Sequence, residues 1–433
     1  MSGPVVEHVI RAPRAVIDGV VRPAAIGLAD GMIRIVDGID ASLDSAGQTV
    51  LDADVVLMPG LVDTHVHIND PGTDWEGFGT ATAAALAGGI TTVVDMPLDS
   101  DPVTTTVAAL DVKRAAAAGV CRVDTEFWGG IVPDNLRSFG ELASAGVLGF
   151  KCFLSESGNP NFPPLDVADF RSAMAVVAEL DSVLLVHAES ARVLADCPPA
   201  SGRGYADFLR SRPDAVEQDA VRIVLDAVAD TGARAHIVHV SSAAVLPMIA
   251  DAKRAGMPVT AETCPHYLTF AAENIPDGGT VFAACPPIRD EENRTQLWAA
   301  LADGTLDMVV SDHSPCAPHN KDLDGGDFGR AFGGISSLQI ALSALWTQAV
   351  LAGFGLPDVC RWMAQAPAAL AGLTDRGVIA PGKRADFCVF DPDESWVVRG
   401  TELRHRHAIT PYEGVKLTGV VRQVWRGGMR EAA

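Results

Sequence analysis

From residue 57 to residue 315 the chain alternates between short apolar runs and longer segments rich in alanine and leucine. The runs are “LMPGLVDTHVHI”, “ITTVVDMP”, “VDTEFWGG”, “VLGFKCFL”, “SVLLVHAES”, “ARAHIVHVSS”, “PVTAETCPHYLTF” and “DMVVSDHSP”. Consecutive apolar positions predict strands buried on both faces, and apolar residues three to four positions apart in the spacers are typical of amphipathic helices. Eight strands alternating with helices predict a (β/α)8 barrel, the TIM barrel of the α/β class. A doubly wound open sheet is the alternative, but no glycine-rich dinucleotide-binding turn follows the first strand.

The two ends of the chain follow another pattern. Residues 1–57 and the tail from 376 onward contain short strand-like runs separated by glycine and aspartate, as in “RAVIDG” and “GVIAPGKRADFCVFDP”. Such spacing predicts strands joined by tight turns. We therefore expect residues 1–57 and 376–433 to form one small composite β-sandwich domain, beside a barrel that spans residues 58–375.

Side chains that commonly bind metal ions, together with one lysine, stand near the ends of several predicted strands. His65 and His67 point in the same direction, because side chains alternate along a strand. The complete set is His65, His67, Lys151, His187, His239 and Asp312. Each of them alone has an ordinary structural explanation, such as a core histidine paired with a neighbour. Active sites of this barrel lie at the carboxyl ends of its strands, so their coincidence there favours a metal centre.

Lys151 lies between apolar neighbours in “GFKCF”. A buried ammonium is costly to desolvate and cannot bind a cation. If the amine adds carbon dioxide, it becomes a carbamate, an anion whose two oxygens could bridge two metal ions. A buried lysine paired with a carboxylate is the alternative, but four histidines and an aspartate nearby favour the carbamate.

Five short segments together carry a resemblance to a known family: “HVH”, “FKCF”, “HAES”, “HVSS” and “SDHSP”. They resemble the cyclic amidohydrolases of the amidohydrolase superfamily, which include dihydroorotases, hydantoinases or dihydropyrimidinases, and allantoinases. The resemblance extends over essentially the whole chain, including the divided β-domain. It implies two divalent metal ions per subunit, with zinc favoured and cobalt, manganese or nickel as alternatives.

The resemblance also implies a role for each residue of the set. One metal ion is expected on His65, His67 and Asp312 and the other on His187 and His239, with a hydroxide and carboxylated Lys151 (N6-carboxylysine) bridging them. Two metal ions lower the pKa of bound water and polarise an amide carbonyl. Asp312 is then the expected catalytic residue, which accepts a proton during attack and returns it to the departing ring nitrogen.

Two positions bear on which cyclic amide is the substrate. Dihydroorotase-like relatives carry an arginine two residues after the second histidine of the first strand, and a histidine four residues after the aspartate; both bind the substrate carboxylate. Here these positions hold Asn69 and Cys316. Neither side chain can neutralise a carboxylate as a cation would, so dihydroorotate is disfavoured.

Other segments look most like the allantoinases: “HVHINDPGTDWEGF”, “VVDMPLDS”, “FWGGIVPDN” and “GGISSLQ”. Hydantoinase-like relatives carry a tyrosine shortly after the lysine, where this chain has “LSESG”, which suits a more polar ring substituent. The resemblance implies hydrolytic ring opening of (S)-allantoin to allantoate in purine catabolism. A hydantoinase or dihydropyrimidinase acting on other cyclic amides is the alternative, and a dihydroorotase or a catalytically silent scaffold homologue is less favoured.

Substrate contacts are expected from residues in the loops around the predicted centre. Asp99 is a departure from the family, which commonly has asparagine after “MPL”; an ionised carboxylate accepts hydrogen bonds but cannot donate them. The expected contacts are Asn69, Asp99, Ser155, Cys285, Ser314, Cys316 and Gly334.

Composition limits the partners of the protein. The 433 residues carry a formal net charge of −22 and are 48% hydrophobic, which allows a large core and disfavours nucleic acids and anionic membranes as partners. No signal-peptide pattern and no membrane-length apolar run is found, so a cytoplasmic protein is expected. The eight cysteines form no CxxC pair, which predicts reduced thiols. The family resemblance adds an expected homotetramer.

Overall fold

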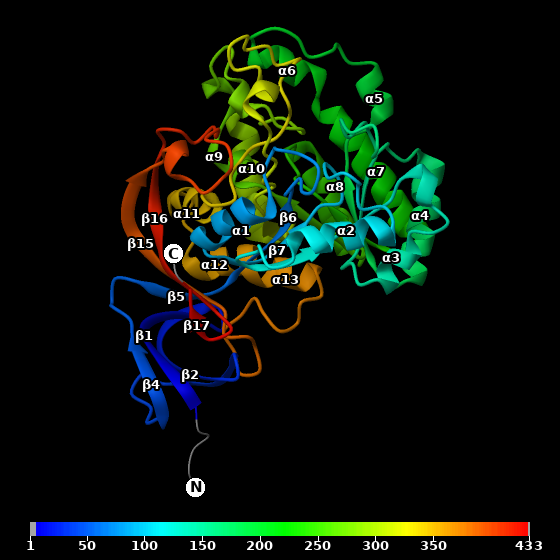
Figure 1. Ribbon diagram of the computed structural model, residues 1–433. Coiled ribbons are helices and arrows are strands. Elements are labelled where there is room, and N and C mark those ends of the chain that lie inside the picture. The colour runs from blue at the N-terminus through cyan, green and yellow to red at the C-terminus, as the bar shows by residue number, and fades with distance from the viewer. Residues whose placement is uncertain (1–5, 432–433) are drawn as a thin grey trace.

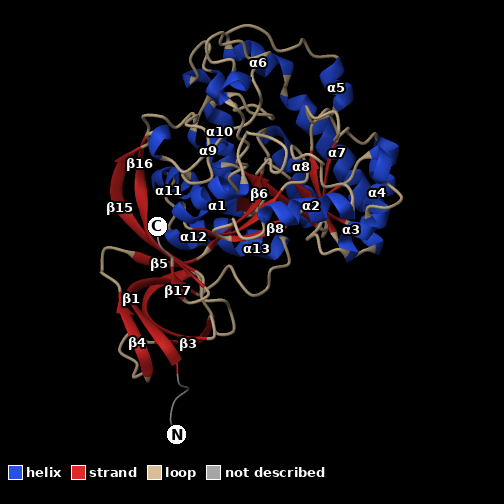
Figure 2. Ribbon diagram, viewed as in Figure 1, coloured by secondary structure: helices blue, strands red, loops and turns tan. Residues whose placement is uncertain are grey.

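The computed structural model describes residues 6–431. Figures 1 and 2 show a large body in which helices surround central strands, and a smaller part made of strands from both ends of the chain. None of the helices within residues 6–431 has the length and apolar character needed to cross a membrane. The eight cysteines are free thiols.

Every apolar run of the central region forms a strand where the sequence predicts one. The strands are β6 (Leu61–Val66), β7 (Ile90–Asp95), β8 (Asp124–Phe127) with β9 (Gly129–Gly130), β10 (Phe150–Phe153), β11 (Val183–His187), β12 (Arg234–Ile237), β13 (Val259–Thr263) and β14 (Met308–Val309). Neighbouring strands are parallel, in the orders β6-β7-β8 and β9-β10-β11-β12-β13-β14.

Backbone hydrogen bonds join these two groups of strands at both edges. At the first edge, Leu148 N, just before β10, donates to Phe127 O of β8 at 3.1 Å, and Gly129 N, in β9, donates to Gly149 O at 2.9 Å. On the opposite side, His313 forms a parallel bridge with Val66, and His67 N donates to His313 O at 2.8 Å. The strands therefore close into a ring, which confirms the predicted barrel.

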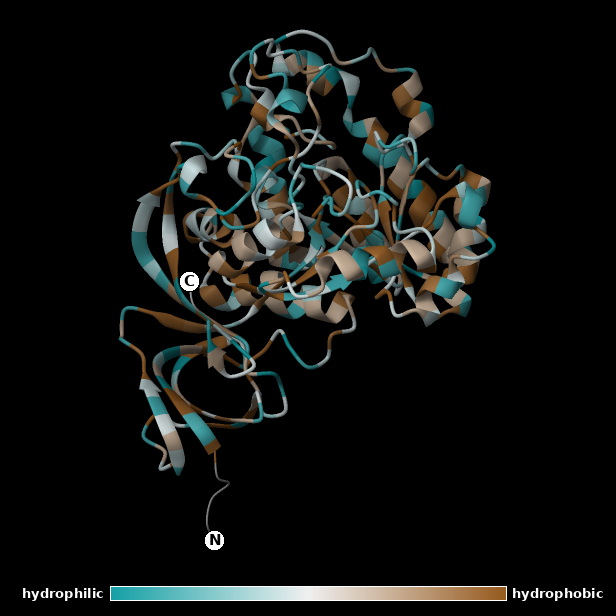
Figure 3. Ribbon diagram, viewed as in Figure 1, coloured by the Kyte–Doolittle hydropathy of each residue, from teal (hydrophilic) through white to brown (hydrophobic). Residues whose placement is uncertain are grey.

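Helices cover the outside of the barrel, and in Figure 3 they carry both hydrophobic and hydrophilic residues. They are α1 (Phe78–Ala87), α2 (Val107–Ala117), α3 (Gly140–Ser144), α4 (Val167–Glu179), α5 (Ala191–Ala195), α6 (Tyr205–Ser211), α7 (Asp214–Thr231), α8 (Leu246–Arg254), α9 (Pro265–Thr269), α10 (Glu291–Asp303), α11 (Ala341–Leu351), α12 (Leu356–Cys360) and α13 (Ala366–Leu370).

Helix α7 is an example of how the sequence determines where a helix begins and ends and which face it buries. Pro213 precedes it, acidic residues occupy its first turn, and Gly232 ends it with a left-handed φ of 70°. These are the residue types that favour a helix start and a helix stop. Its buried apolar side chains are spaced three to four residues apart and face inward: Val216, Ala220, Val221, Val224, Ala227 and Val228.

The strands from the two ends of the chain form one eight-stranded sheet. They are β1 (Val6–Ile17), β2 (Val20–Ala29), β3 (Met32–Asp37), β4 (Ser45–Val50), β5 (Val56–Pro59), β15 (Phe387–Val397), β16 (Lys416–Arg426) and β17 (Met429–Arg430). The sheet curls so that Ile33 N, in β3, donates to Lys383 O at 2.8 Å, just before β15. The predicted sandwich is therefore a single wrapped sheet around its own core, and the boundaries 1–57, 376–433 and 58–375 stay a prediction.

A buried ion pair fixes the chain just after β6. Lys113, on α2, donates to Asp95 Oδ2 at 2.6 Å and to Met96 O at 2.8 Å. The other oxygen of Asp95 accepts a hydrogen bond from Ile68 N at 2.8 Å. Both side chains of the pair are fully buried. The pair therefore anchors the segment that contains His67.

Replacing Lys113 with Met is expected to lower the stability of the protein markedly, because Asp95 would remain as a buried, unpaired carboxylate. Breaking a buried pair in this way costs about 3–5 kcal/mol. Arg171→Met is the control, since Arg171 and Asp230 form a half-exposed pair at 3.7 Å, and such pairs contribute about 1 kcal/mol or less. Thermal unfolding compares the variants; equal midpoints would contradict the anchoring role.

Candidate metal centre

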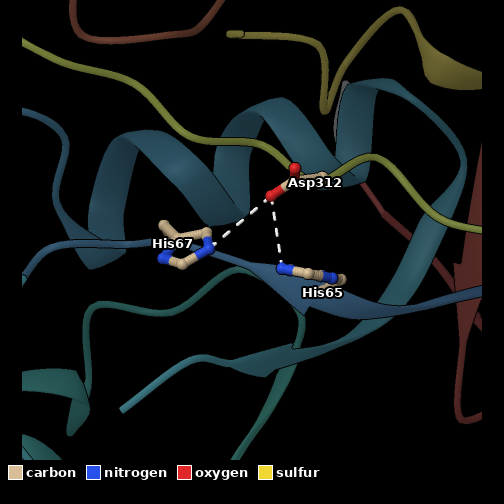
Figure 4. A group of neighbouring side chains, drawn as sticks. All are labelled: His65, His67 and Asp312. Atoms are coloured by element: carbon tan, nitrogen blue, oxygen red, sulfur yellow. Dashed lines mark ion pairs between the residues drawn. The ribbon is translucent and has the colours of Figure 1, made fainter. Parts of the chain in front are cut away.

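Two histidines and an aspartate meet at the end of β6. His65 Nε2 lies 3.2 Å and His67 Nε2 3.6 Å from the same oxygen, Asp312 Oδ1, as the dashed lines in Figure 4 indicate. His65 is in β6, His67 directly follows it, and Asp312 follows β14. The ligand atoms of the three residues all lie within 4.8 Å of one another. This is a group that could hold a metal ion.

A second pair of histidines lies beside the first. His187, the last residue of β11, places Nδ1 2.9 Å from Nε2 of His239, which follows β12. The ring of Phe153 stacks on His187 with centroids 4.5 Å apart. The ring centroids of His239 and His65 are 5.4 Å apart. The four imidazoles therefore form one continuous cluster, as the positions in the sequence predict.

Lys151 reaches the same region from β10. It is the second residue of this four-residue strand rather than the last. Its Nζ is buried without a hydrogen-bond partner within the described chain and lies 4.9 Å from the centroid of Phe153. Burial lowers the pKa of Lys151 to about 8, against the opposite influence of Glu262 and Asp312. The neutral, nucleophilic form of this amine is therefore reached at a lower pH than for an exposed lysine.

These side chains fit divalent metal ions. Burial lowers the pKa of His67 and of His239 well below the usual value, so both rings are neutral and can act as ligands. His65 Nε2 and Lys151 Nζ have no hydrogen-bond partner in residues 6–431. Buried polar atoms without hydrogen-bond partners destabilise a fold unless they bind something else, such as a metal ion. Imidazole and carboxylate groups together are ligands that suit zinc and similar ions.

The ring nitrogen of His187 that does not contact His239 binds a carboxylate, Glu189. Glu189 Oε2 accepts from His187 Nε2 at 2.8 Å and from Arg212 Nη1 at 2.5 Å. Although burial opposes it, Arg212 and His187 hold the pKa of Glu189 at about 2. Such partners fix which ring nitrogen of a metal-binding histidine is free to bind the ion.

Asp312 is held in an uncommon backbone conformation. Its φ is 43°, and that of His239 is 38°, both in the left-handed region that non-glycine residues rarely adopt. Ser314 Oγ donates to Asp312 Oδ1 at 2.9 Å. Burial raises the pKa of Asp312, which makes its carboxylate a stronger base.

The six residues line a cavity of about 710 Å³. Five of the substrate contacts expected from the sequence also line it: Asn69, Asp99, Ser155, Cys285 and Ser314. The other two expected contacts, Cys316 and Gly334, are not among the described residues that line the cavity. Gly333, the neighbour of Gly334, does line it. Gly334 is turned into the packing behind the wall, where its N–H donates to Ala283 O at 3.0 Å.

The model of the amidohydrolase family matches residues 56–430 of the chain. The chain belongs to the amidohydrolase family. The likeness of this amidohydrolase to solved structures extends over the whole fold. It superposes on the L-hydantoinase (dihydropyrimidinase) of Arthrobacter aurescens with a TM-score of 0.93 and 27% identity, over 99% of this chain and 96% of that one. For the D-hydantoinase of Bacillus sp. AR9 the TM-score is 0.85 at 25% identity, over 98% and 95% of the two chains.

Curated relatives are similar over three quarters or more of their length. The allantoinase of Streptomyces avermitilis is 49% identical over 98% of this chain and 95% of its own. The allantoinase of Saccharomyces cerevisiae is 40% identical over 97% and 94%. The mitochondrial allantoinase of Aquarana catesbeiana is 47% identical over 84% and 76%.

Glu262 is a further residue of the candidate metal centre, one that the sequence pattern does not predict. It accepts hydrogen bonds from His65 Nδ1 at 2.5 Å, from His236 Nε2 at 2.9 Å and from the backbone N of His239 at 3.4 Å. Its side chain is fully buried. The available signal was a glutamate in the apolar run “PVTAETC”, where a barrel strand has no water to solvate a charge.

Glu262→Gln is expected to weaken divalent-metal binding by about 10- to 100-fold, because an amide has only one acceptor oxygen and cannot accept from both His65 and His236 as the carboxylate does. Competition with a chromophoric chelator measures the affinity. Glu126→Gln is the control, since Glu126 belongs to the neighbouring part of the barrel, in β8, and only half of it is buried. Equal affinities for the two variants would count against this role of Glu262.

Proposed function

We propose that this amidohydrolase opens the ring of (S)-allantoin by hydrolysis and releases allantoate, a step of purine catabolism. The observation that carries the proposal is the cluster of four histidines, Lys151 and Asp312 on the wall of one cavity. The family supplies the reaction class, and the similarity to curated allantoinases from bacteria and yeast supports the substrate.

The residues present would hold two divalent ions. His65, His67 and Asp312 would hold one, and His187 and His239 the other, with Lys151 between them as a carbamate. In carbamate formation the neutral amine bonds to the carbon of carbon dioxide and releases a proton. Zinc is favoured for this donor set, with cobalt, manganese and nickel as alternatives. When bound, such ions lower the pKa of a water molecule and polarise the carbonyl of a cyclic amide.

The protein supplies the proton transfers through Asp312. Its carboxylate would take a proton from the attacking water and pass it to the ring nitrogen as the carbon–nitrogen bond breaks. Ser314 orients this carboxylate through the hydrogen bond to Oδ1, at 2.9 Å. The pKa of Asp312, raised by burial, brings its proton affinity closer to what both transfers require.

Acceptor groups in the cavity support a substrate rich in N–H groups. Asp99 lines the cavity, and Ser155 Oγ and Asn69 Oδ1 are buried without partners in the described chain. Arg212 also lines the cavity, but Glu189 pairs with it at 2.5 Å. This arrangement suits the ureido group of allantoin better than the carboxylate of dihydroorotate.

The second candidate function is that of a hydantoinase or dihydropyrimidinase with wider specificity. The structural likeness to the L-hydantoinase of Arthrobacter aurescens favours it. The identity of 27% to that protein is lower than the 49% to the allantoinase of Streptomyces avermitilis.

A panel of allantoin, hydantoin, dihydrouracil and dihydroorotate tests the proposal, with the metal-supplemented protein. We expect allantoin to have the highest kcat/KM, because it alone of the four carries a ureido substituent whose N–H groups can donate to the acceptors of the cavity. A higher kcat/KM for dihydrouracil than for allantoin would contradict the proposal and favour the second candidate function. Lys151→Ala is the control for the centre: it should open none of the four rings and regain part of its activity with short carboxylic acids, which restore the anion.

The pKa of Asp99, raised to about 6 by burial, predicts a pH dependence of substrate binding. Above this pH the ionised carboxylate accepts hydrogen bonds from the ureido N–H groups through both oxygens, and below it the protonated form loses its charge and turns one oxygen into a donor, which weakens these bonds. The KM for allantoin is therefore expected to rise as the pH falls through about 6. Asp99→Asn should remove this component, because an amide does not titrate. KM values for both proteins on either side of that pH are the measurement, and parallel profiles would rule the effect out.

The cytoplasmic location and the homotetramer expected from the sequence stay predictions.

A further inference from the structure

Lys321 is a buried lysine outside the metal centre. It ends the short helical turn Pro318–Lys321, and its residue is 3% exposed. Nζ donates to three backbone carbonyls: Ala283 O at 3.1 Å, Phe332 O at 2.8 Å and Gly334 O at 2.5 Å. An ammonium carries three hydrogens. Each of them therefore has an acceptor, and all three acceptors are peptide groups.

This arrangement differs from the other buried lysine that makes hydrogen bonds. Lys113 pairs with a carboxylate, Asp95, at 2.6 Å. No carboxylate of residues 6–431 forms an ion pair with Lys321, and burial lowers its pKa to about 8. Burying an ammonium costs desolvation free energy. The three carbonyls offset this cost only if all of them lie within hydrogen-bond distance of Nζ. The lysine therefore ties the position of its three acceptors together.

The three carbonyls belong to two segments that form a wall of the cavity. Cys285, Phe332 and Gly333 line the cavity, whereas Lys321 does not. The segments also bond to each other, because Gly334 N donates to Ala283 O. A Cβ on Gly333 would lie 2.6 Å from Cys285 Sγ, so the two segments are closely packed. Lys321 holds this contact from behind the wall.

We propose that Lys321 is a positioning residue that clamps segments 283–285 and 332–334 together and so sets the wall against which the substrate ring lies. The inference rests on the proposed function, since it assigns that wall to a cyclic amide. The lysine touches neither substrate nor metal ligands, so its loss should change substrate binding more than the chemical step. A wall held at both segments presents its peptide groups at fixed positions, and hydrogen bonds to substrate depend on such positions.

Lys321→Met and Lys321→Gln form a graded series for the test. Methionine donates no hydrogen bond and glutamine donates two, so the effect should be larger for methionine. For Lys321→Met we expect KM to rise roughly tenfold, as for the loss of one substrate hydrogen bond, with kcat changed by less than about threefold. Metal content per chain should equal that of the unaltered protein.

Lys253→Met is the matched control. Lys253 also binds a backbone carbonyl, Gly304 O at 2.9 Å, and pairs with Asp307 at 2.6 Å, but it lies at the amino ends of the strands, away from the cavity. This variant should keep KM unchanged even if its thermal midpoint falls. A rise in KM of equal size in both lysine variants would mean a general loss of stability and would overturn the proposal.

Hydrogen exchange separates the clamp from the proposed function. In Lys321→Met, amides of residues 283–285 and 332–334 should exchange faster than in the unaltered protein, while those of β6 and β11 keep their rates. Unchanged exchange in the two segments overturns the clamp, whatever the activity. If exchange rises and KM for the ring opened best in the panel stays constant, the assignment of the wall to substrate is overturned. If the unaltered protein opens no ring of the panel, the proposed function fails, and the exchange result alone decides on the clamp.

Discussion

The carboxylate of Glu262, buried at the centre of the barrel, is the group on which the rest of the site depends. Water cannot reach it, so only N–H donors can stabilise its charge. These donors are the rings of His65 and His236 and the backbone of His239. They come from β6, from β12 and from the loop after β12. The packing of the barrel and the orientation of the candidate ligands are thus determined by the same interaction.

Backbone conformation adds a second constraint at the same place. Asn69, Asp99, His239 and Asp312 have φ angles of 58°, 60°, 38° and 43°. All four line the cavity. A left-handed conformation costs a non-glycine residue on the order of 1 kcal/mol. The cost is sustained because fixed groups surround these residues, such as Glu262 beside His239 and Ser314 beside Asp312.

The sequence alone predicts the barrel because each buried strand is a continuous apolar run with its polar residues at one end. It also predicts the cluster, since His65, His67, His187, His239 and Asp312 stand at equivalent places in different runs. It does not predict Glu262, Arg212 or Lys321, whose partners come from distant segments and leave no local spacing. The sequence does not place loop residues such as Cys316 and Gly334 for a related reason: a loop has no periodicity that indicates which residue faces the cavity.

The joining of both chain ends in one sheet has a consequence for synthesis on the ribosome. β5 pairs with β15, and β3 meets residue 383, so the first strands find these partners only after the barrel residues have been made. Until then they present two open edges, and open edges invite pairing with other chains. A chain that stops after residue 375 would contain every residue of the candidate metal centre and still be prone to aggregate.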